Sequence, residues 1–457
     1  MKRLICFICV LFCLDTFNLF AESVSREEVH RQAVMACMRI STEDFSDKAY
    51  TITPILQEKD ICYYIVQFEP EGWALISADD RVQPVIGYSD KGLFQKEEAP
   101  EAARLWLEKR AKEIQVIKSL KGLKRDLNWE AHSLRSDNKE NIIKPLIKVN
   151  WNQDGDYAKY TPKTFKGEKT YVGCVAVAMG QAMTVSQYPQ KPKGRFAYSI
   201  ENIGHLEINY DEEPAYDWEK IMIGADRNDE VARLLYHCGL SVGMKYGPKT
   251  SGAHGDRVSD ALVRYFSYSK DSVKYYRKRY VTDSGTLKYI SDDDWHRIIV
   301  NELKQKRPVI HTLGTLMHMA NIDGYDGVDA YHFNMGWGGN GNGYYTFDKK
   351  IYQGNNKQHE DAYLEMIVGL IPEKNSSTNI QSVAQSLETP LQVVGSLLRL
   401  KSPEKGICRV YDLSGALLQT APVVAGDNEI PLKTKGLCIL SIDCNGKVAS
   451  HKIHVKE

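Results

Sequence analysis

One run of small and apolar residues, which begins at Cys174, constrains the fold of this chain more than any other segment. Its apolar positions recur at the spacing of one helical face and are Val175, Ala178, Met179, Ala182 and Met183. Ala176 and Gly180 are small enough to let such a helix pack closely under a cleft. The sequence therefore predicts a buried helix whose first residue is a cysteine.

A cysteine at a helix N-terminus lies where partial positive charge favours the thiolate over the thiol, and a nearby imidazolium strengthens this preference. In favourable surroundings the pKa of a cysteine falls from about 8.5 to as low as ~3–4. A thiolate is a nucleophile for acyl transfer, so Cys174 is predicted to be a catalytic nucleophile. The alternative is a buried cysteine that merely opens a core helix.

Polar side chains elsewhere in the sequence fit the same chemistry. The side-chain amide of Gln153 can stabilise the negative charge that develops on a carbonyl oxygen, unless Trp-Asn-Gln is only a surface turn. His318 is favoured as the base because a tight turn at 323–324 would return the chain and place Asn334 beside it, where Asn334 accepts the other ring N–H. His332 points the same way as Asn334 by strand alternation and is the runner-up, although a packed role suits it better.

Composition and the first residues indicate an exported protein. The 59 basic and 59 acidic residues balance, which gives no reason to expect nucleic acid or an anionic membrane as partner. Met1-Lys2-Arg3 precedes an apolar run over 4–14, and Ala21 is a small residue at the expected cleavage point. This pattern predicts a signal peptide over 1–21, with a membrane anchor as the alternative. We expect no membrane-spanning segment in the mature protein.

The cysteine pattern argues against a disulfide scaffold or a metal site. Of ten cysteines, three lie in the predicted signal peptide, and the middle of the chain holds only Cys174 and Cys238. Cys238 lies in an apolar helical context and is predicted to be core. No Cys-x-x-Cys pair follows the signal peptide, so neither a metal nor another cofactor is expected. The pairing of Cys408, Cys438 and Cys444 stays open.

The chain divides into segments of different composition. An N-terminal segment, 22–140, has strands and a helix near 101–123, and it ends in a polar, cleavable linker near 131–144. The largest segment, 141–372, has a helical half followed by short strands, which predicts the α+β class. A polar linker over 373–390 precedes 391–457, whose short alternating strands predict a small β-sandwich.

Five motifs resemble, in order and spacing, those of the streptopain family of secreted papain-like cysteine peptidases. They are Trp151-Asn152-Gln153, Gly173-Cys174-Val175-Ala176, Met244–Pro248, His318–Gly324 and Asn334–Gly339. The N-terminal segment also resembles the family's inhibitory propeptide, at 72–81 and 85–90.

The resemblance implies a zymogen of a secreted cysteine endopeptidase with a papain-like catalytic domain over 141–372, made of a helical half and an antiparallel sheet half. Its partners would be protein or peptide substrates and its own propeptide. By this resemblance Cys174 is the nucleophile, His318 the general acid and base, Gln153 the oxyanion-hole donor and Asn334 the residue that orients the histidine.

The chain departs from the family pattern near the histidine. Leu316-Met317 stand where the family usually has two glycines, and Met335 stands where it has a tryptophan. The loop after Pro248 would line the substrate cleft, so Thr250, Gly252 and Ala253 are predicted to bind substrate. Met317, directly before the histidine, is the fourth predicted substrate-binding residue. These departures leave open an inactive relative that binds peptides or peptidases without cutting them. Acyl transfer to amines through the same thioester also stays open.

The last segment resembles a sorting domain of type IX secretion. The matching stretches are Val410–Gly415, Glu429–Leu432, Gly436–Ser441 and Lys452–Val455. This resemblance implies contact with a secretion machinery and a final location outside the cell or on its surface. A generic adhesion sandwich is the alternative.

Overall fold

The computed structural model describes most of the chain in two units, Met1–Lys374 and Asn375–Glu457. The described residues are 24–96, 101–130, 141–223, 229–282, 284–314, 318–346, 364–373, 391–411, 417–444 and 447–455. The predicted signal peptide over 1–21 and most of the predicted linkers near 131–144 and 373–390 lie outside these residues.

Seven α-helices occur among the described residues, all in the first unit. They are α1 (Arg26–Ile40), α2 (Glu101–Ser119), α3 (Cys174–Thr184), α4 (Trp218–Ile223), α5 (Asp229–Ser241), α6 (Asp256–Arg264) and α7 (Asp292–Lys304). Two begin with a serine cap, since the Ser25 hydroxyl accepts the N–H of Glu28 and the Ser291 hydroxyl accepts that of Asp294. None of the described helices is long and apolar enough to span a bilayer.

A single antiparallel sheet of ten strands runs through the first unit. In spatial order its strands are β1 (Tyr50–Gln57), β2 (Asp60–Phe68), β3 (Trp73–Ser77), β4 (Val85–Ser89), β13 (Gly343–Tyr345), β12 (Tyr331–Asn334), β11 (Met319–Tyr325), β10 (Val309–Thr312), β14 (Glu365–Val368) and β7 (Lys274–Arg277). The four N-terminal strands thus extend the sheet of the central segment, because β4 pairs with β13. The sequence did not predict this continuity.

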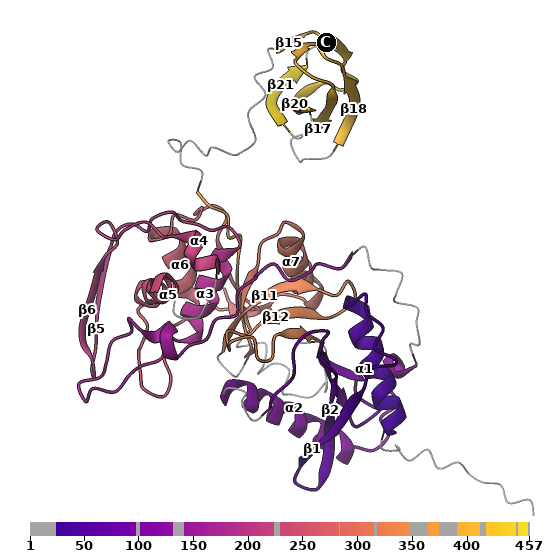
Figure 1. Ribbon diagram of the computed structural model, residues 1–457, viewed down its shortest axis with the longest axis vertical. Coiled ribbons are helices and arrows are strands. Elements are labelled where there is room, and N and C mark those ends of the chain that lie inside the picture. Colours follow the sequence, from indigo (N-terminus) through magenta and orange to yellow (C-terminus); the bar gives the residue numbers. More distant parts are fainter. Residues whose placement is uncertain are drawn as a thin grey trace, which may run out of the picture. The chain divides into compact units, whose positions relative to one another are not determined.

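Three hydrophobic cores flank this sheet. Helices α3 to α6 share one core with Trp151 and with β10 and β11, and these helices lie together beside the sheet (Figure 1). Helices α2 and α7 pack into a second core with strands of both segments. Helix α1 packs in a third core, against β3 and β4. Two small hairpins complete the unit: β5 (Arg195–Ile200) with β6 (Gly204–Asn209), and β8 (Arg279–Val281) with β9 (Leu287–Tyr289).

The second unit contains two antiparallel sheets. One is β15 (Leu391–Val394), β16 (Leu397–Ser402) and β19 (Gly426–Pro431); the other is β18 (Leu417–Val423), β17 (Gly406–Tyr411), β20 (Gly436–Cys444) and β21 (Lys447–Val455). Alternate residues of β20 are buried, as a strand with one face on a core requires. Cys408, Cys438 and Cys444 are free and buried in this unit.

Local patterns located the two helices predicted at Cys174 and near 101–123 within a few residues. Helix α3 begins at Cys174, and α2 ends at Ser119, four residues before the predicted end. Strand β11, however, continues through Asp323 and Gly324 to Tyr325, where a tight turn was predicted. Gly324 instead pairs with His332 on β12. A glycine in a strand is compatible with this close approach, since a side chain there would collide with His332.

Candidate active site

Cys174 lies at the N-terminus of α3, and the residue before it must be glycine. Gly173 adopts φ 90°, which favours glycine. A Cβ at this position would also lie 3.0 Å from the Ser251 carbonyl oxygen and 2.7 Å from the Met244 sulfur. The loop that contains Ser251 is therefore packed directly against the start of α3.

Strand β11 brings His318 to the same place. His318 immediately precedes β11, and the backbone N–H of the next residue, Met319, points to the Cys174 thiol. Farther along, the Asn321 side chain donates to the Ala178 carbonyl oxygen over 2.9 Å, which fixes β11 against α3. The backbone at His318 and Met319 therefore lies at the N-terminal end of α3, where Cys174 is.

The Cys174 thiol and the His318 imidazole are both uncharged at neutral pH in the full-length chain. Burial raises the pKa of the Cys174 thiol, although nearby backbone N–H groups oppose the shift. Burial also lowers the pKa of His318 to about 4, against the effect of its hydrogen bond to the Met335 carbonyl. The predicted low pKa of Cys174 is therefore wrong for this form, because desolvation outweighs the helix N-terminus.

Met335, rather than Asn334, holds the imidazole of His318. The Met335 carbonyl oxygen lies 2.9 Å from Nε2 of His318. The ring also packs on Trp337, with 4.5 Å between ring centroids. If Nε2 carries the proton and donates it to the carbonyl, Nδ1 is the proton acceptor.

The side-chain amide of Asn334 has other partners. It donates to the Val149 carbonyl over 2.9 Å and accepts from Gln181 of α3 over 3.0 Å. Asn334 is buried and lies opposite Asn321 in the β11–β12 pair. The predicted hydrogen bond from His318 to this amide is therefore wrong. The amide instead joins β12 to α3 through Gln181.

Gln153 and the predicted substrate loop lie next to the segment that leads into α3. The Gln153 carbonyl accepts the N–H of Val172 over 2.8 Å, and its side chain is half-buried. The loop is attached to the same segment, because the Ser251 hydroxyl donates to the Tyr171 carbonyl over 2.7 Å.

The predicted substrate-binding residues of this loop differ in exposure. Thr250 and Gly252 are exposed and Ala253 is half-buried. Met317, together with Leu316, lies outside the described residues.

His332 has a structural partner instead of a place beside the thiol. Its Nδ1 lies 2.6 Å from Asp323, whose other carboxylate oxygen accepts the N–H of Ile147 over 2.9 Å. The ring packs edge-on against Tyr344. Two features were not predicted from the sequence: the Asp323–His332 pair and the contact of His318 with the Met335 carbonyl. Strand alternation could have suggested the first, but a backbone carbonyl carries no residue-type signal.

The N-terminal segment (described residues 24–96 and 101–130) is attached to the central segment by strand pairing. Tyr88 and Gly87 of β4 lie opposite Tyr344 and Tyr345 of β13. Gly87 is required by this close approach, since a Cβ there would lie 2.5 Å from the Tyr345 ring. The N–H of Thr346 continues the pairing by donating to the Ile86 carbonyl over 3.3 Å.

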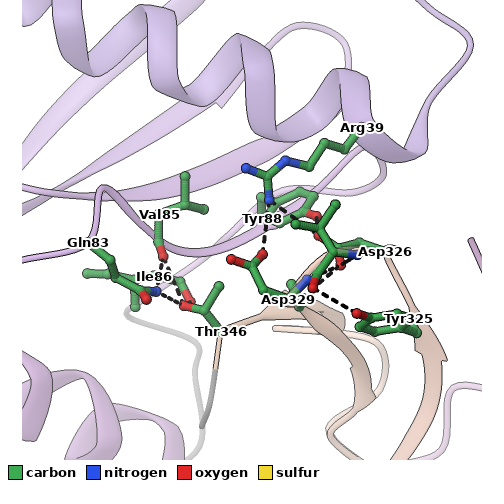
Figure 2. Close-up of polar contacts among 11 residues, drawn as sticks. Arg39, Gln83, Val85, Ile86, Tyr88, Tyr325, Asp326, Asp329 and Thr346 are labelled. Carbon is green, nitrogen blue, oxygen red and sulfur yellow. Dashed lines mark hydrogen bonds and ion pairs between the residues drawn. The ribbon is translucent and has the colours of Figure 1, made fainter. Parts of the chain in front are cut away.

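A buried group of charged residues holds the same interface (Figure 2). Arg39 of α1 forms ion pairs with Asp326 (3.3 Å) and Asp329 (3.2 Å) of the β11–β12 connection. The Tyr88 hydroxyl donates to Asp326 over 2.8 Å. The other oxygen of Asp326 accepts three backbone N–H groups, including that of Ala330 over 2.9 Å. The guanidinium of Arg39 is thus paired with two carboxylates of a turn that its own backbone N–H groups stabilise.

Two protein-family models match parts of this chain. Residues 151–345 match the Peptidase C10 family, and residues 22–114 match the Spi protease inhibitor family. Thiol protease/hemagglutinin PrtT of Porphyromonas gingivalis is 26% identical over 346 residues, which are 71% of this chain and 38% of that protein. Streptopain of Streptococcus pyogenes is 26% identical over 340 residues, which are 68% of this chain and 80% of that protein.

The fold is shared with a solved precursor. A fragment of prointerpain A from Prevotella intermedia, a cysteine-to-alanine mutant, covers 71% of this chain and 100% of its own length, with a TM-score of 0.56 and 24% identity. Together these matches confirm the resemblance predicted from the five motifs and from the N-terminal segment. Both family matches end before the second unit begins.

Proposed function

We propose that this chain is a member of the Peptidase C10 family and a cysteine endopeptidase made as an inactive precursor. One observation carries the proposal: the thiol of Cys174, at the N-terminus of a buried helix, faces the backbone N–H of the residue after His318. Replacement of Cys174 by alanine tests it directly, since both self-processing and proteolysis should stop.

In the proposed reaction His318 takes the proton of the Cys174 thiol, and the thiolate attacks the carbonyl carbon of a peptide bond. The tetrahedral intermediate then collapses as the imidazolium protonates the leaving amine, which leaves a thioester on Cys174. Water, deprotonated by the same imidazole, hydrolyses the thioester and restores the thiol. The Met335 carbonyl supports this sequence by holding Nε2, so that Nδ1 handles the proton.

Gln153 is proposed to stabilise the oxyanion of that intermediate. Its backbone carbonyl accepts a hydrogen bond from the N–H of Val172, which lies two residues before Cys174. This bond holds Gln153 close to the start of α3. A side-chain amide and the Cys174 backbone N–H would together supply two donors for the developing charge. Thr250, Gly252 and Ala253 are proposed to line the substrate cleft, and Met317 remains a candidate from the sequence.

Replacing Gln153 by alanine should lower kcat about 10²–10³-fold, because one oxyanion donor is lost. KM should change little, since the donor acts mainly on the transition state. Steady-state hydrolysis of a fluorogenic peptide by the processed protein measures both. Gln190→Ala, which removes an exposed amide in the same segment, should leave kcat unchanged. An unchanged kcat in Gln153→Ala would assign the oxyanion donor elsewhere.

The N-terminal segment is proposed to act as an inhibitory propeptide. Support comes from its match to the Spi inhibitor family and from its strand pairing with β13. It also packs Phe94, Trp106 and Leu107 beside Met335 and Trp337, next to the proposed base. Cleavage near 131–144 is proposed to release it.

Residues 391–457 are proposed to be a sorting domain for type IX secretion, which would make the protein secreted or surface-attached. Support comes from the motif order in the sequence and from the separate two-sheet unit. A chain that stops after Lys374 should stay in the periplasm of a bacterium that has this machinery, whereas the full chain leaves the cell. Immunoblots of medium and periplasm measure the distribution. Equal export of both chains would contradict the sorting role.

A further inference from the structure

An apolar pocket lies beside His318, between the central and N-terminal segments. Its central wall consists of Leu313, Met335, Trp337, Asn340, Gly341 and Tyr345. Three of these residues contact the histidine. The N–H of Leu313 donates to the His318 carbonyl over 2.8 Å, and the contacts of Met335 and Trp337 with the imidazole are described above. A side chain held in this pocket therefore lies next to the proposed base.

Two aromatic side chains and a leucine of the N-terminal segment close this pocket in the full-length chain. Phe94, Trp106 and Leu107 line its other wall. The ring of Trp106 meets Tyr345 edge-on, with 5.3 Å between centroids. Edge-to-face contacts of this kind are favourable between aromatic rings. The pocket is thus shaped to pack against large aromatic groups.

The pocket also contacts the main chain next to Phe94. Asn340 donates its side-chain N–H to the Gln95 carbonyl oxygen over 3.3 Å. Phe94 and Gln95 belong to neither a helix nor a strand, so they reach the pocket as a peptide loop. An aromatic side chain and the adjacent carbonyl are therefore contacted together, as they would be in a bound peptide.

The fit between the two walls is close. The space left between them is about 20 Å³, which is room for about one water molecule. Met335 contributes an adaptable side chain at the position where the family pattern has a tryptophan. Once Phe94, Trp106 and Leu107 leave, the central wall would present an apolar surface with one polar donor at its edge.

We propose that, after loss of the N-terminal segment, this pocket binds a large aromatic side chain of the peptide substrate. Asn340 holds the carbonyl next to that side chain, as it holds that of Gln95 here. The inference rests on the proposed peptidase function and names a specificity for it, a preference for phenylalanine or tryptophan at one position near the cleaved bond.

The test is a comparison of fluorogenic peptides with protein that has matured from the full chain. The peptides are identical except for Phe, Trp, Leu, Ala or Asp, scanned through the positions on either side of the cleaved bond. At one position, Phe or Trp should raise kcat/KM about 10-fold or more over Ala. Hydrophobic pockets commonly distinguish larger from smaller apolar side chains by at least about this factor in kcat/KM. Asp at the same position should be the poorest substrate.

Two variants assign the preference to this pocket. Leu313→Trp fills it, so the ratio of kcat/KM for the Phe and Ala peptides should fall towards one. Asn340→Ala removes the donor at the half-buried edge. It should raise KM for the Phe peptide several-fold more than for the Ala peptide, because only a side chain seated in the pocket places the adjacent carbonyl at this donor. Because both peptides are measured on the same variant, a general loss of activity cancels in the ratio of their kcat/KM values. If Leu313→Trp does not fold, Asn340→Ala alone tests the assignment. Tyr289→Ala, an exposed ring on β9, should keep the wild-type ratio.

The outcomes separate the two proposals. Equal cleavage of the five peptides at every position would overturn the pocket assignment and leave the peptidase function intact. A preference that both Leu313→Trp and Asn340→Ala retain would overturn it as well. Cleavage of no peptide by the processed wild-type protein would overturn the proposed function, and this inference with it.

Discussion

Replacing Cys174 by alanine should abolish both the trimming of the full-length chain and its cleavage of casein. The sulfur is the only atom in the proposed site that can form the thioester, so no slower route through the same intermediate remains. Loss of a catalytic nucleophile commonly costs roughly 10⁴-fold or more in kcat. Gel analysis over time follows trimming, and release of labelled casein fragments follows proteolysis.

Cys238→Ala is the matched control for this experiment. Cys238 is buried in α5 and contacts the Met183 sulfur, so its loss should cost some stability but no chemistry. Continued casein cleavage by the Cys174→Ala chain would refute the nucleophile. An epoxysuccinyl thiol reagent adds a second readout on processed wild-type protein: labelling at Cys174 supports catalysis, whereas an unreactive thiol supports the peptide-binding alternative.

The sequence predicted those parts of the site that depend on local pattern. Helical spacing of small and apolar residues placed Cys174 at the first position of α3, because periodicity within one element needs no tertiary information. The antiparallel pairing of β11, which His318 directly precedes, with β12, which ends at Asn334, followed from strand patterns and a short connection. Cys238 was predicted to be core from its apolar neighbours, and it is buried.

Contacts between distant segments could not be predicted in the same way. The β4–β13 pair joins residues more than 250 positions apart, and β13 has only three residues, Gly343–Tyr345. Three residues give almost no periodicity to detect. The partner of His318 was also missed, because a backbone carbonyl is available at every position and side-chain chemistry pointed to Asn334 instead.

The charge state of Cys174 shows a third limit. A helix N-terminus can be recognised in a sequence, and it favours the thiolate. Desolvation depends on what covers the thiol, and it reverses the direction of the shift in the full-length chain. The sequence therefore predicted the position of the nucleophile but not its protonation in this form.

Replacing Arg39 by alanine should loosen the N-terminal segment on the central segment. Asp326 is fully buried and Asp329 is largely buried, so their carboxylates have little water to replace the guanidinium. Truncating one partner of such a buried pair costs about 2–5 kcal/mol. Since 1.4 kcal/mol corresponds to tenfold, opening of the interface should become about 30-fold or more frequent.

Hydrogen exchange in a Cys174→Ala background measures this opening without self-cleavage. The amide of Thr346 is the reporter, because it donates across the interface to the Ile86 carbonyl. Its exchange should accelerate about 30-fold or more in Arg39→Ala. Arg26→Ala, which removes an exposed guanidinium from the same helix, should leave it unchanged. Unaltered Thr346 exchange in Arg39→Ala would show that strand pairing and the apolar contacts hold the segment without the ion pairs.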